Sequence, residues 1–256
     1  MTDTLHAFGD SFVVGDQDDF LGQVPGATHG MPWPERLEYL KTQVSFVSIL
    51  ARHYGYHLQN HAERGSGNYP QIDRVWLNLI NGNIKPGDTV LFGITTTIRD
   101  RFLLHDVDRC TNDSHGPFMI DRKLIAKDSE RHRLLELDYF YILSLLDQLS
   151  RKFGVRIVKF NLFDNSLDHA NSRITDLCQV DDFVGWATPG NTLIDILNDS
   201  WGQGVFYTFA HEEIKIPRGL EHLYTAKKHP SIAGHQKIAD WWIRNNILSN
   251  HVVSVN

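Results

Sequence analysis

Residues 4–12 read TLHAFGDSF. The first five residues form a short strand candidate, and Gly9-Asp10-Ser11 follows directly as a tight turn. In an open α/β sheet, ligands bind beyond the carboxyl ends of the strands, so a serine placed there exposes its hydroxyl among free backbone N–H groups. The same tripeptide also serves as an ordinary cap for a following helix. The stretch predicts the first strand of an α/β sheet and a candidate nucleophile, Ser11.

Strand-like and helix-like segments alternate along the rest of the chain. Helical spacing predicts helices over residues 34–54, 68–81, 129–153, 193–197 and 231–248, and apolar or β-branched runs predict strands over 57–61, 89–94, 155–161 and 205–209. This alternation predicts a three-layer α/β/α sandwich with a mostly parallel, flavodoxin-like sheet. No repeat or linker divides the chain, so residues 1–256 are expected to form one domain.

Two long polar stretches interrupt the alternation, near residues 99–127 and 164–203. Both are rich in Asp, Asn, His and Gly. Loops of this length in a compact domain usually act as lids or binding loops, or contain short elements that the pattern misses. We expect them to be loop insertions in the single domain.

Composition indicates a globular protein. The 256 residues include 25 basic and 31 acidic side chains, for a net charge of −6, and 41% are hydrophobic. The acidic balance and the lack of a Lys/Arg run predict no nucleic-acid partner. The N-terminus shows no signal peptide, and no apolar run approaches the roughly 20 residues that span a bilayer. These observations predict a cytoplasmic protein without a membrane span.

Metal and cofactor motifs are missing from the sequence. Cys110 and Cys178 are too few for a disulfide framework or a zinc site of paired CxxC motifs, and whether they pair with each other is left open. The acidic run at residues 16–19 is expected to be a solvated loop. No HExxH, Walker A or Gly-x-Gly-x-x-Gly pattern occurs, so we expect neither a metal nor a cofactor.

A second chemical signal lies near the C-terminus, where residues 228–239 read KHPSIAGHQKIA. A histidine directly before proline is disfavoured in a helix, so His229 is expected in a loop ahead of the final helix. From such a loop its imidazole can reach a nucleophile at a strand end. His235 falls inside the predicted helix and is expected to be a structural or surface histidine.

These two signals together resemble the first and last sequence blocks of the SGNH (GDSL-type) hydrolases. The segment from Asn60 to Gly65 is similar to the family's second block, and the blocks follow the family's order along the chain. The resemblance implies the SGNH hydrolase fold and hydrolysis of a carboxylic ester through an acyl-Ser11 intermediate. It also implies that His229 is the general base and that the N–H groups of Ser11 and Gly65 are oxyanion donors. The chemistry is consistent, because serine is a weak nucleophile until a neighbouring base activates it.

Two positions depart from the family pattern. The third block, in which Asn usually follows Gly by two residues, reads Gly-Ile-Thr and ends at Thr95. Thr95, Thr96 or Asn68 is therefore predicted to supply the missing oxyanion donor. The aspartate expected three residues before His229 is Ala226. The group that orients His229 is thus open between a backbone carbonyl and a remote acid such as Glu221.

Two residues are predicted to contact the substrate. Asp10 lies next to the serine, and Arg99 follows the third predicted strand, where it could hold an anionic substrate or pair with Asp100. Three tryptophans in loop regions could line a glycan cleft, namely Trp33, Trp186 and Trp201. A small-molecule or glycan ester is the expected substrate, and an O-acetylated carbohydrate is preferred.

A reading from a different functional class stays open. A catalytically silent SGNH-like module that binds a ligand or serves a structural role would explain Thr95 and Ala226 at the two altered positions. Ser11, Gly65 and His229 favour the enzyme. The natural substrate and the oligomeric state are not specified by the sequence.

Overall fold

The computed structural model describes residues 3–15, 31–95, 129–162, 183–184, 192–199, 216–226 and 228–249. Its elements in chain order are β1 (Thr4–Phe8), α1 (Ser11–Val14), α2 (Trp33–Tyr39), η1 (Leu40–Val44), α3 (Phe46–Tyr54), β2 (His57–Asn60), α4 (Asn68–Ile80), β3 (Thr89–Ile94), α7 (Ser129–Phe153), β4 (Arg156–Asn161), β5 (Phe183–Val184), α9 (Leu193–Asn198), η4 (Glu221–Leu223) and α10 (Ile232–Arg244). Several predicted features lie outside the described residues: the strand at 205–209, the acidic run at 16–19, and Thr96, Arg99, Cys110, Cys178, Trp186 and Trp201.

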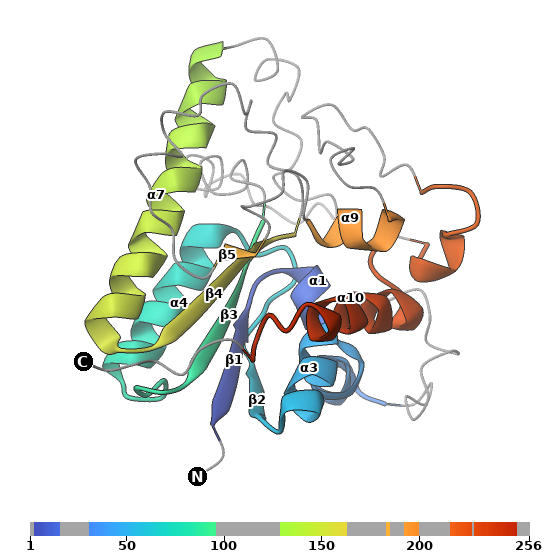
Figure 1. Cartoon of the computed structure of the whole chain (residues 1–256), viewed down its shortest axis with the longest axis horizontal. Helices are drawn as coiled ribbons and strands as arrows, with labels where there is room; N and C mark the ends of the chain where they lie inside the picture. Colours follow the sequence, from blue (N-terminus) through green and yellow to red (C-terminus); the bar gives the residue numbers. More distant parts are fainter. Residues whose placement is uncertain are drawn as a thin grey trace.

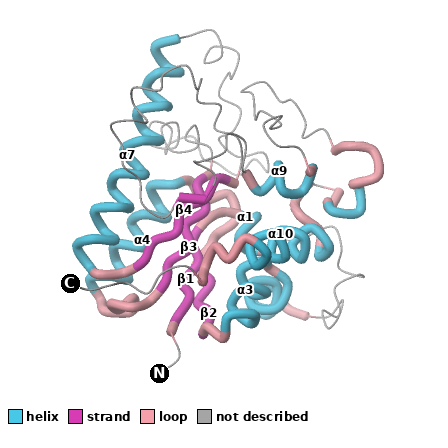
Figure 2. The backbone as a smooth tube through the Cα atoms, viewed as in Figure 1, coloured by secondary structure: helices cyan, strands magenta, loops and turns pink. Residues whose placement is uncertain are grey.

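The strands form one sheet in the order β2-β1-β3-β4-β5. Figure 1 labels all five strands, and Figure 2 shows the sheet in magenta. Each neighbouring pair is parallel. The chain runs outward from β1 to β2 and then returns past β1 to β3, which is the flavodoxin-like order with its switch point beside β1. The predicted parallel, flavodoxin-like sheet is confirmed.

Helices cover both faces of this sheet (Figure 1), with α4 and α7 on one face and α1, α3 and α10 on the other. Alternation along β1 explains how one strand serves both layers. Leu5 and Ala7 pack in the core with α3 and α10, whereas Phe8 packs in the core with α4 and α7. The predicted three-layer α/β/α architecture is therefore confirmed.

The prediction of one continuous helix over residues 34–54 is wrong. The chain forms α2, then the π-helical segment η1, and restarts as α3 after Ser45. Ser45 has an extended ψ of 147°, its Oγ accepts from the Ser48 N–H, and it donates to the Lys41 carbonyl. Serine is a preferred N-cap for this reason. The apolar pattern hides the break, because Leu40 and Leu50 are both buried across it.

Two smaller differences concern short or terminal elements. The strand β5 was not expected, since two residues are too few to show an alternating pattern. Together with α9 it lies within the stretch predicted as a loop insertion at 164–203, so this stretch contributes to the sheet. The final helix ends at Arg244 rather than at residue 248, and Asn246 nearby has a left-handed φ of +51°.

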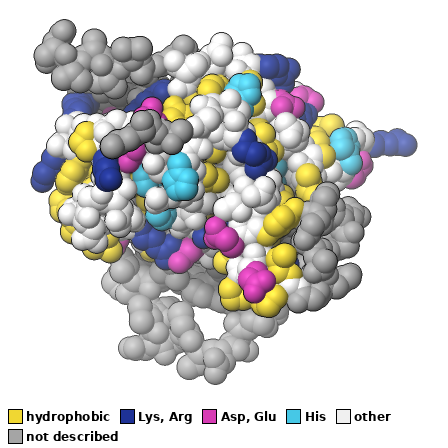
Figure 3. All heavy atoms as spheres, turned by 90° about the horizontal axis from the view of Figure 1, so that it is seen from below, with side chains coloured by type: hydrophobic (Ala, Val, Ile, Leu, Met, Phe, Trp, Pro, Cys, Tyr) yellow, Lys and Arg dark blue, Asp and Glu magenta, His cyan; other side chains and the backbone are white. Residues whose placement is uncertain are grey.

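In the part of the chain that the structure describes, no helix is both long and apolar enough to cross a bilayer. Figure 3 shows the molecule from below, at the amino ends of the strands. Basic, acidic and apolar side chains are interspersed over the described part of this face, without a large patch of one charge sign.

Candidate active site

Ser11 is the first residue of α1 and follows β1 after a two-residue turn. Gly9 in that turn has a φ of +151°, and a Cβ there would lie 2.5 Å from Val13 Cγ2, so only glycine fits. Asp10 caps the helix, since its Oδ1 accepts from the Phe12 N–H at 3.0 Å. This strand–turn–helix holds Ser11 at the carboxyl edge of the sheet, where ligands bind in such folds.

Ser11 and His229 lie side by side although 218 residues separate them. The distance between Ser11 Oγ and His229 Nε2 is 3.0 Å, which is within hydrogen-bond reach. The imidazole also meets the Phe12 ring edge-on, with centroids 5.5 Å apart. A neutral imidazole in this position can accept the hydroxyl proton of the serine.

The loop that carries His229 is fastened by Thr225, a residue that sequence reasoning missed. The Thr225 N–H donates to the His229 carbonyl at 2.8 Å, and the His229 N–H donates to Thr225 Oγ1 at 3.1 Å. Between them, Lys228 has a left-handed φ of +64°, which is uncommon for a residue with a Cβ. In the sequence, this small turn is indicated only by a threonine four residues before His229.

The serine and the glycine of the His-Pro-Ser-x-x-Gly-His stretch, Ser231 and Gly234, have structural roles behind this loop. Ser231 caps α10 by accepting from the Gly234 N–H, and its hydroxyl donates to the His222 carbonyl at 2.6 Å. A Cβ on Gly234 would lie 2.3 Å from the Leu223 carbonyl oxygen. Glycine is therefore required for α10 to pack against η4, and this packing anchors the loop.

The orienting acid of the family pattern has no counterpart at its usual position. Ala226 is exposed there, and a methyl group accepts no hydrogen bond. The carboxylate of Glu221 is exposed and accepts from the Gly219 N–H at 2.8 Å. Glu221 is thus engaged away from His229, and the structure does not support it as the orienting acid.

Thr95 and Asn68 bind each other and brace the turn before Ser11. Asn68 Oδ1 accepts from the Thr95 N–H at 2.9 Å, and Asn68 Nδ2 donates to the Thr95 carbonyl at 3.1 Å. The Thr95 hydroxyl lies 3.2 Å from Asp10 Oδ2, to which it donates its single proton. These contacts do not support the prediction that the Thr95 hydroxyl donates to an oxyanion. For Asn68 that role stays a prediction.

The prediction that Asp10 contacts the substrate does not fit the structure. Its side chain is fully buried, and its two oxygens accept from the Phe12 N–H and the Thr95 hydroxyl. A carboxylate enclosed in this way holds the backbone beneath the serine instead of meeting a ligand. Asp10 is therefore a positioning residue.

Gly65 lies in an exposed turn beyond β2 and has a left-handed φ of +68°. The chain leading to it runs beside the end of β1, since the His61 N–H donates to the Ala7 carbonyl and the Glu63 N–H donates to the Gly9 carbonyl at 3.0 Å. The turn is thus held next to the segment that leads into Ser11. Oxyanion donation by the Gly65 N–H stays a prediction.

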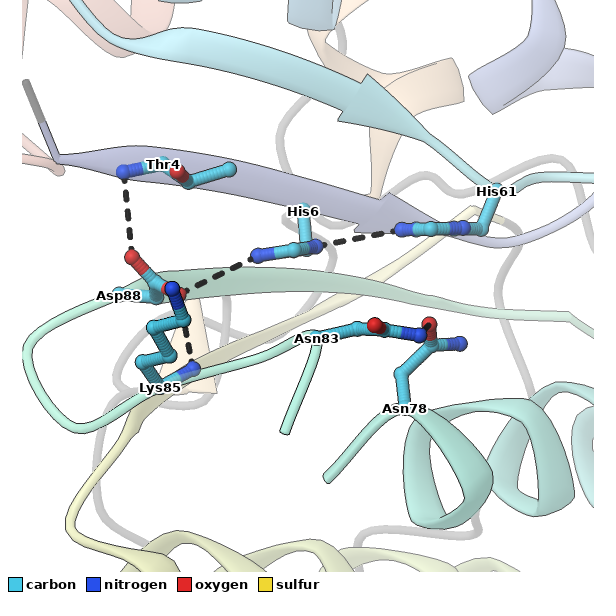
Figure 4. Close-up of polar contacts among 7 residues, drawn as sticks. All are labelled: Thr4, His6, His61, Asn78, Asn83, Lys85 and Asp88. Carbon is cyan, nitrogen blue, oxygen red and sulfur yellow. Dashed lines mark hydrogen bonds and ion pairs between the residues drawn. The ribbon is translucent and has the colours of Figure 1, made fainter. Parts of the chain in front are cut away.

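A partly buried row of polar side chains, Asp88–His6–His61, leads toward this turn (Figure 4). His6 Nε2 lies 3.4 Å from Asp88 Oδ2, and His6 Nδ1 lies 3.2 Å from His61 Nε2. The Asp88 carboxylate also accepts from the N–H groups of Thr4 and Lys85. Burial lowers the pKa of His6, and it lowers the pKa of His61 to about 4 with help from the nearby charges of His6, Lys41 and Arg74. Both imidazoles are neutral in the folded protein near pH 7.

His235 is a core histidine behind the site. Its ring stacks on Phe46 with centroids 6.3 Å apart, and Nδ1 accepts from the Phe46 N–H at 3.3 Å. Full burial, with a smaller effect of the His229 charge, lowers the pKa of His235 to about 3. It supports α10 and takes no direct part in the contact between Ser11 and His229.

The protein is expected to lose stability in mild acid. The reason is that burial lowers the pKa values of three histidines, His6, His61 and His235. The unfolded chain binds protons near pH 6.5 and the folded chain does not, so the free energy of unfolding is constant above that pH and falls toward pH 4. His235→Gln, which keeps a hydrogen-bond acceptor, is expected to reduce this slope by up to about 1.4 kcal/mol per pH unit. Urea denaturation at several pH values between about 7.5 and 4.5 measures it, and equal slopes in both proteins would contradict the prediction.

Among the described residues, no group of three or more His, Cys, Asp or Glu side chains is arranged to hold a metal ion.

Comparison with protein-family models and with curated protein sequences finds no match. Among solved structures, the chain is similar to a carbohydrate esterase whose active site displays divergent catalytic and non-catalytic binding functions, at 17% identity and a TM-score of 0.45, covering 98% of this chain and 69% of that one. It is also similar to Axe2, an acetylxylan esterase from Geobacillus stearothermophilus, at 17% identity and a TM-score of 0.44, covering 94% and 93% of the two chains. Structural similarity at this level of sequence identity and TM-score says nothing about the chemistry of the site. The function proposed below rests on this chain's own side chains.

Proposed function

We propose that this protein is a serine esterase that hydrolyses a carboxylic ester through an acyl-Ser11 intermediate. The observation that supports it is the 3.0 Å contact between Ser11 Oγ and His229 Nε2 at the carboxyl edge of the sheet. A nucleophile in hydrogen-bond reach of its base is the signature of an activated serine.

In the proposed reaction, Ser11 Oγ attacks the ester carbonyl while His229 Nε2 takes the hydroxyl proton. The imidazolium then gives that proton to the departing alcohol, and water, activated by the same imidazole, releases the acid from Ser11. The backbone N–H groups of Ser11 and Gly65 are the proposed donors to the oxyanion. Loss of one such donor typically costs about 3–4 kcal/mol of transition-state stabilisation.

The proposed substrate is an O-acetylated carbohydrate. An exposed indole, Trp33, supports a glycan, since its side chain is 38% exposed and can stack on a sugar ring. We expect acetate release from acetylated oligosaccharides, and at least tenfold lower kcat/KM for p-nitrophenyl octanoate than for p-nitrophenyl acetate. A preference for the octanoyl ester would contradict the carbohydrate class while leaving the serine mechanism in place.

Thr95→Val separates a bracing role from an oxyanion role. Removing the hydroxyl leaves the buried Asp10 carboxylate short of one donor, so the free energy of unfolding should fall by about 1–3 kcal/mol. We expect turnover to fall modestly as well, because Asp10 holds the turn that presents Ser11. Thr95→Ser should restore both. If turnover instead falls by about 100-fold or more while stability is unchanged, the hydroxyl is an oxyanion donor.

A catalytically silent binding module is the second candidate, and Ala226 favours it. In serine triads, loss of the orienting carboxylate slows turnover by about 10⁴-fold. Hydrolysis of p-nitrophenyl acetate that depends on Ser11 excludes the silent module. Absence of both hydrolysis and Ser11 acylation in folded protein would favour it.

A further inference from the structure

The polar contacts of the Asp88–His6–His61 row have a direction (Figure 4). The Asp88 carboxylate only accepts, so the His6 nitrogen that faces it at 3.4 Å, Nε2, carries the ring hydrogen. His6 is fully buried and neutral, so its Nδ1 is an acceptor. The atom 3.2 Å from that acceptor, His61 Nε2, is therefore the donor. The row thus fixes both the tautomer and the ring orientation of His61.

His61 is also fastened to the strand that leads into Ser11. Its ring stacks on the Phe8 ring, with centroids 4.7 Å apart and planes within 15° of each other. Its backbone N–H donates to the Ala7 carbonyl at 2.8 Å, and its carbonyl accepts from Arg74 Nη1 at 3.4 Å. Side chain and backbone together therefore fix His61 between the end of β1 and α4.

The turn that carries Gly65 begins two residues after His61. The Glu63 N–H donates to the Gly9 carbonyl at 3.0 Å, and the Ser66 N–H closes the turn on the Glu63 carbonyl at 3.3 Å. Gly65 is the third residue of this turn, a position where a left-handed φ, here +68°, favours glycine. Because the turn is this short and begins so close to His61, a shift of His61 relative to β1 also moves Gly65.

We propose that His61 is a positioning residue for the oxyanion site. Held by the Asp88–His6–His61 row, it sets the spacing between the Gly65 N–H and the Ser11 N–H, which are the two proposed donors. This inference rests on the proposed esterase function for its place in the reaction. A donor stabilises the oxyanion only when it is aimed at it, and a misplacement of about 1 Å can slow a reaction about 100-fold.

Two substitutions separate the hydrogen bond of His61 from its ring. His61→Phe keeps a ring against Phe8 and removes the donor to His6, whereas His61→Gln keeps an N–H donor of similar reach and removes the ring. We expect His61→Phe to lower kcat/KM for p-nitrophenyl acetate by about 10- to 100-fold, and His61→Gln by no more than about threefold. His61→Asn is too short to reach His6 and adds no apolar bulk, so it should match His61→Phe even if the latter folds poorly.

Hydrogen–deuterium exchange of the peptides that cover residues 61–67 measures the position of the turn without turnover. Exchange there should be faster in His61→Phe and His61→Asn than in the wild type, and close to wild type in His61→Gln. Exchange in α10 should be unchanged in all three variants, which shows that the fold is intact. His53→Phe is the matched control, since His53 is an exposed histidine of α3, and it should leave both kcat/KM and exchange unchanged.

Wild-type kcat/KM in His61→Phe and His61→Asn would overturn the proposal, whether or not their exchange is faster. Equal impairment of His61→Gln and His61→Phe would overturn the role of the hydrogen-bonded row. A wild type that hydrolyses p-nitrophenyl acetate while the His61 variants behave like it defeats this inference alone. An inactive wild type whose turn loosens as expected in His61→Phe and His61→Asn defeats only the esterase.

Discussion

Ser11→Ala is expected to lower kcat/KM for p-nitrophenyl acetate by about 10⁴- to 10⁶-fold, and His229→Ala by a similar factor. The reason is the single contact between Ser11 Oγ and His229 Nε2 at 3.0 Å, which couples the nucleophile to its base. Since the two groups act as a unit, the double variant should be little worse than either single variant. Steady-state kinetics on the three proteins measures this.

Matched controls come from residues of the same types elsewhere. Ser249 and His222 are exposed, and neither side chain takes part in the contact at the site. Ser249→Ala and His222→Ala should retain wild-type activity, and all variants should unfold at temperatures close to that of the wild type. Activity above one tenth of wild type in either Ser11→Ala or His229→Ala would refute the proposed pair.

The largest effect on stability is expected at a buried ion pair. Lys159 on β4 and Asp147 on α7 are 1% and 4% exposed, and the Lys159 ammonium donates to the Asp147 carboxylate. Asp147→Ala leaves a lysine charge in the core without its partner, which typically costs about 3–5 kcal/mol. Urea denaturation near pH 7.5 gives the free energy of unfolding of each protein.

A double substitution shows whether the cost comes from the unpaired charge. Asp147→Leu combined with Lys159→Met replaces the pair by apolar groups and should recover most of the stability that Asp147→Ala loses. Asp240→Ala, at an exposed aspartate of α10, should change the free energy of unfolding by less than about 0.5 kcal/mol. A loss below about 1 kcal/mol for Asp147→Ala would contradict the buried pair.

The fold could be predicted where buried residues recur in the sequence with the spacing of a helix or a strand. The predicted strand Thr4–Phe8, the strand Thr89–Ile94 and the helix Ser129–Phe153 occur at the predicted residues. The helix break at Ser45 was not predicted, because the N-cap is a local hydrogen bond that does not disturb the pattern of apolar residues. The strand β5 was not predicted, because its register is set by pairing with β4 and its own sequence shows no strand pattern.

The candidate site could be predicted only in its chemically distinctive residues. Ser11 and His229 stand out by their place after a strand and before a proline, and the structure brings them together. The bracing roles of Asp10 and Thr225 depend on which polar group lies opposite in three dimensions, which spacing does not encode. The buried contact between Asp10 and Thr95 is an example, because 85 residues separate its partners.

Covalent labelling of Ser11 tests the proposed mechanism most directly. Folded wild-type protein is treated with a fluorophosphonate probe, and the modified peptide is identified by mass spectrometry. We predict one adduct on Ser11, lost in Ser11→Ala and slowed at least 100-fold in His229→Ala. No adduct on folded wild type, or an adduct on Ser11 that forms equally fast without His229, would contradict a serine activated by its histidine.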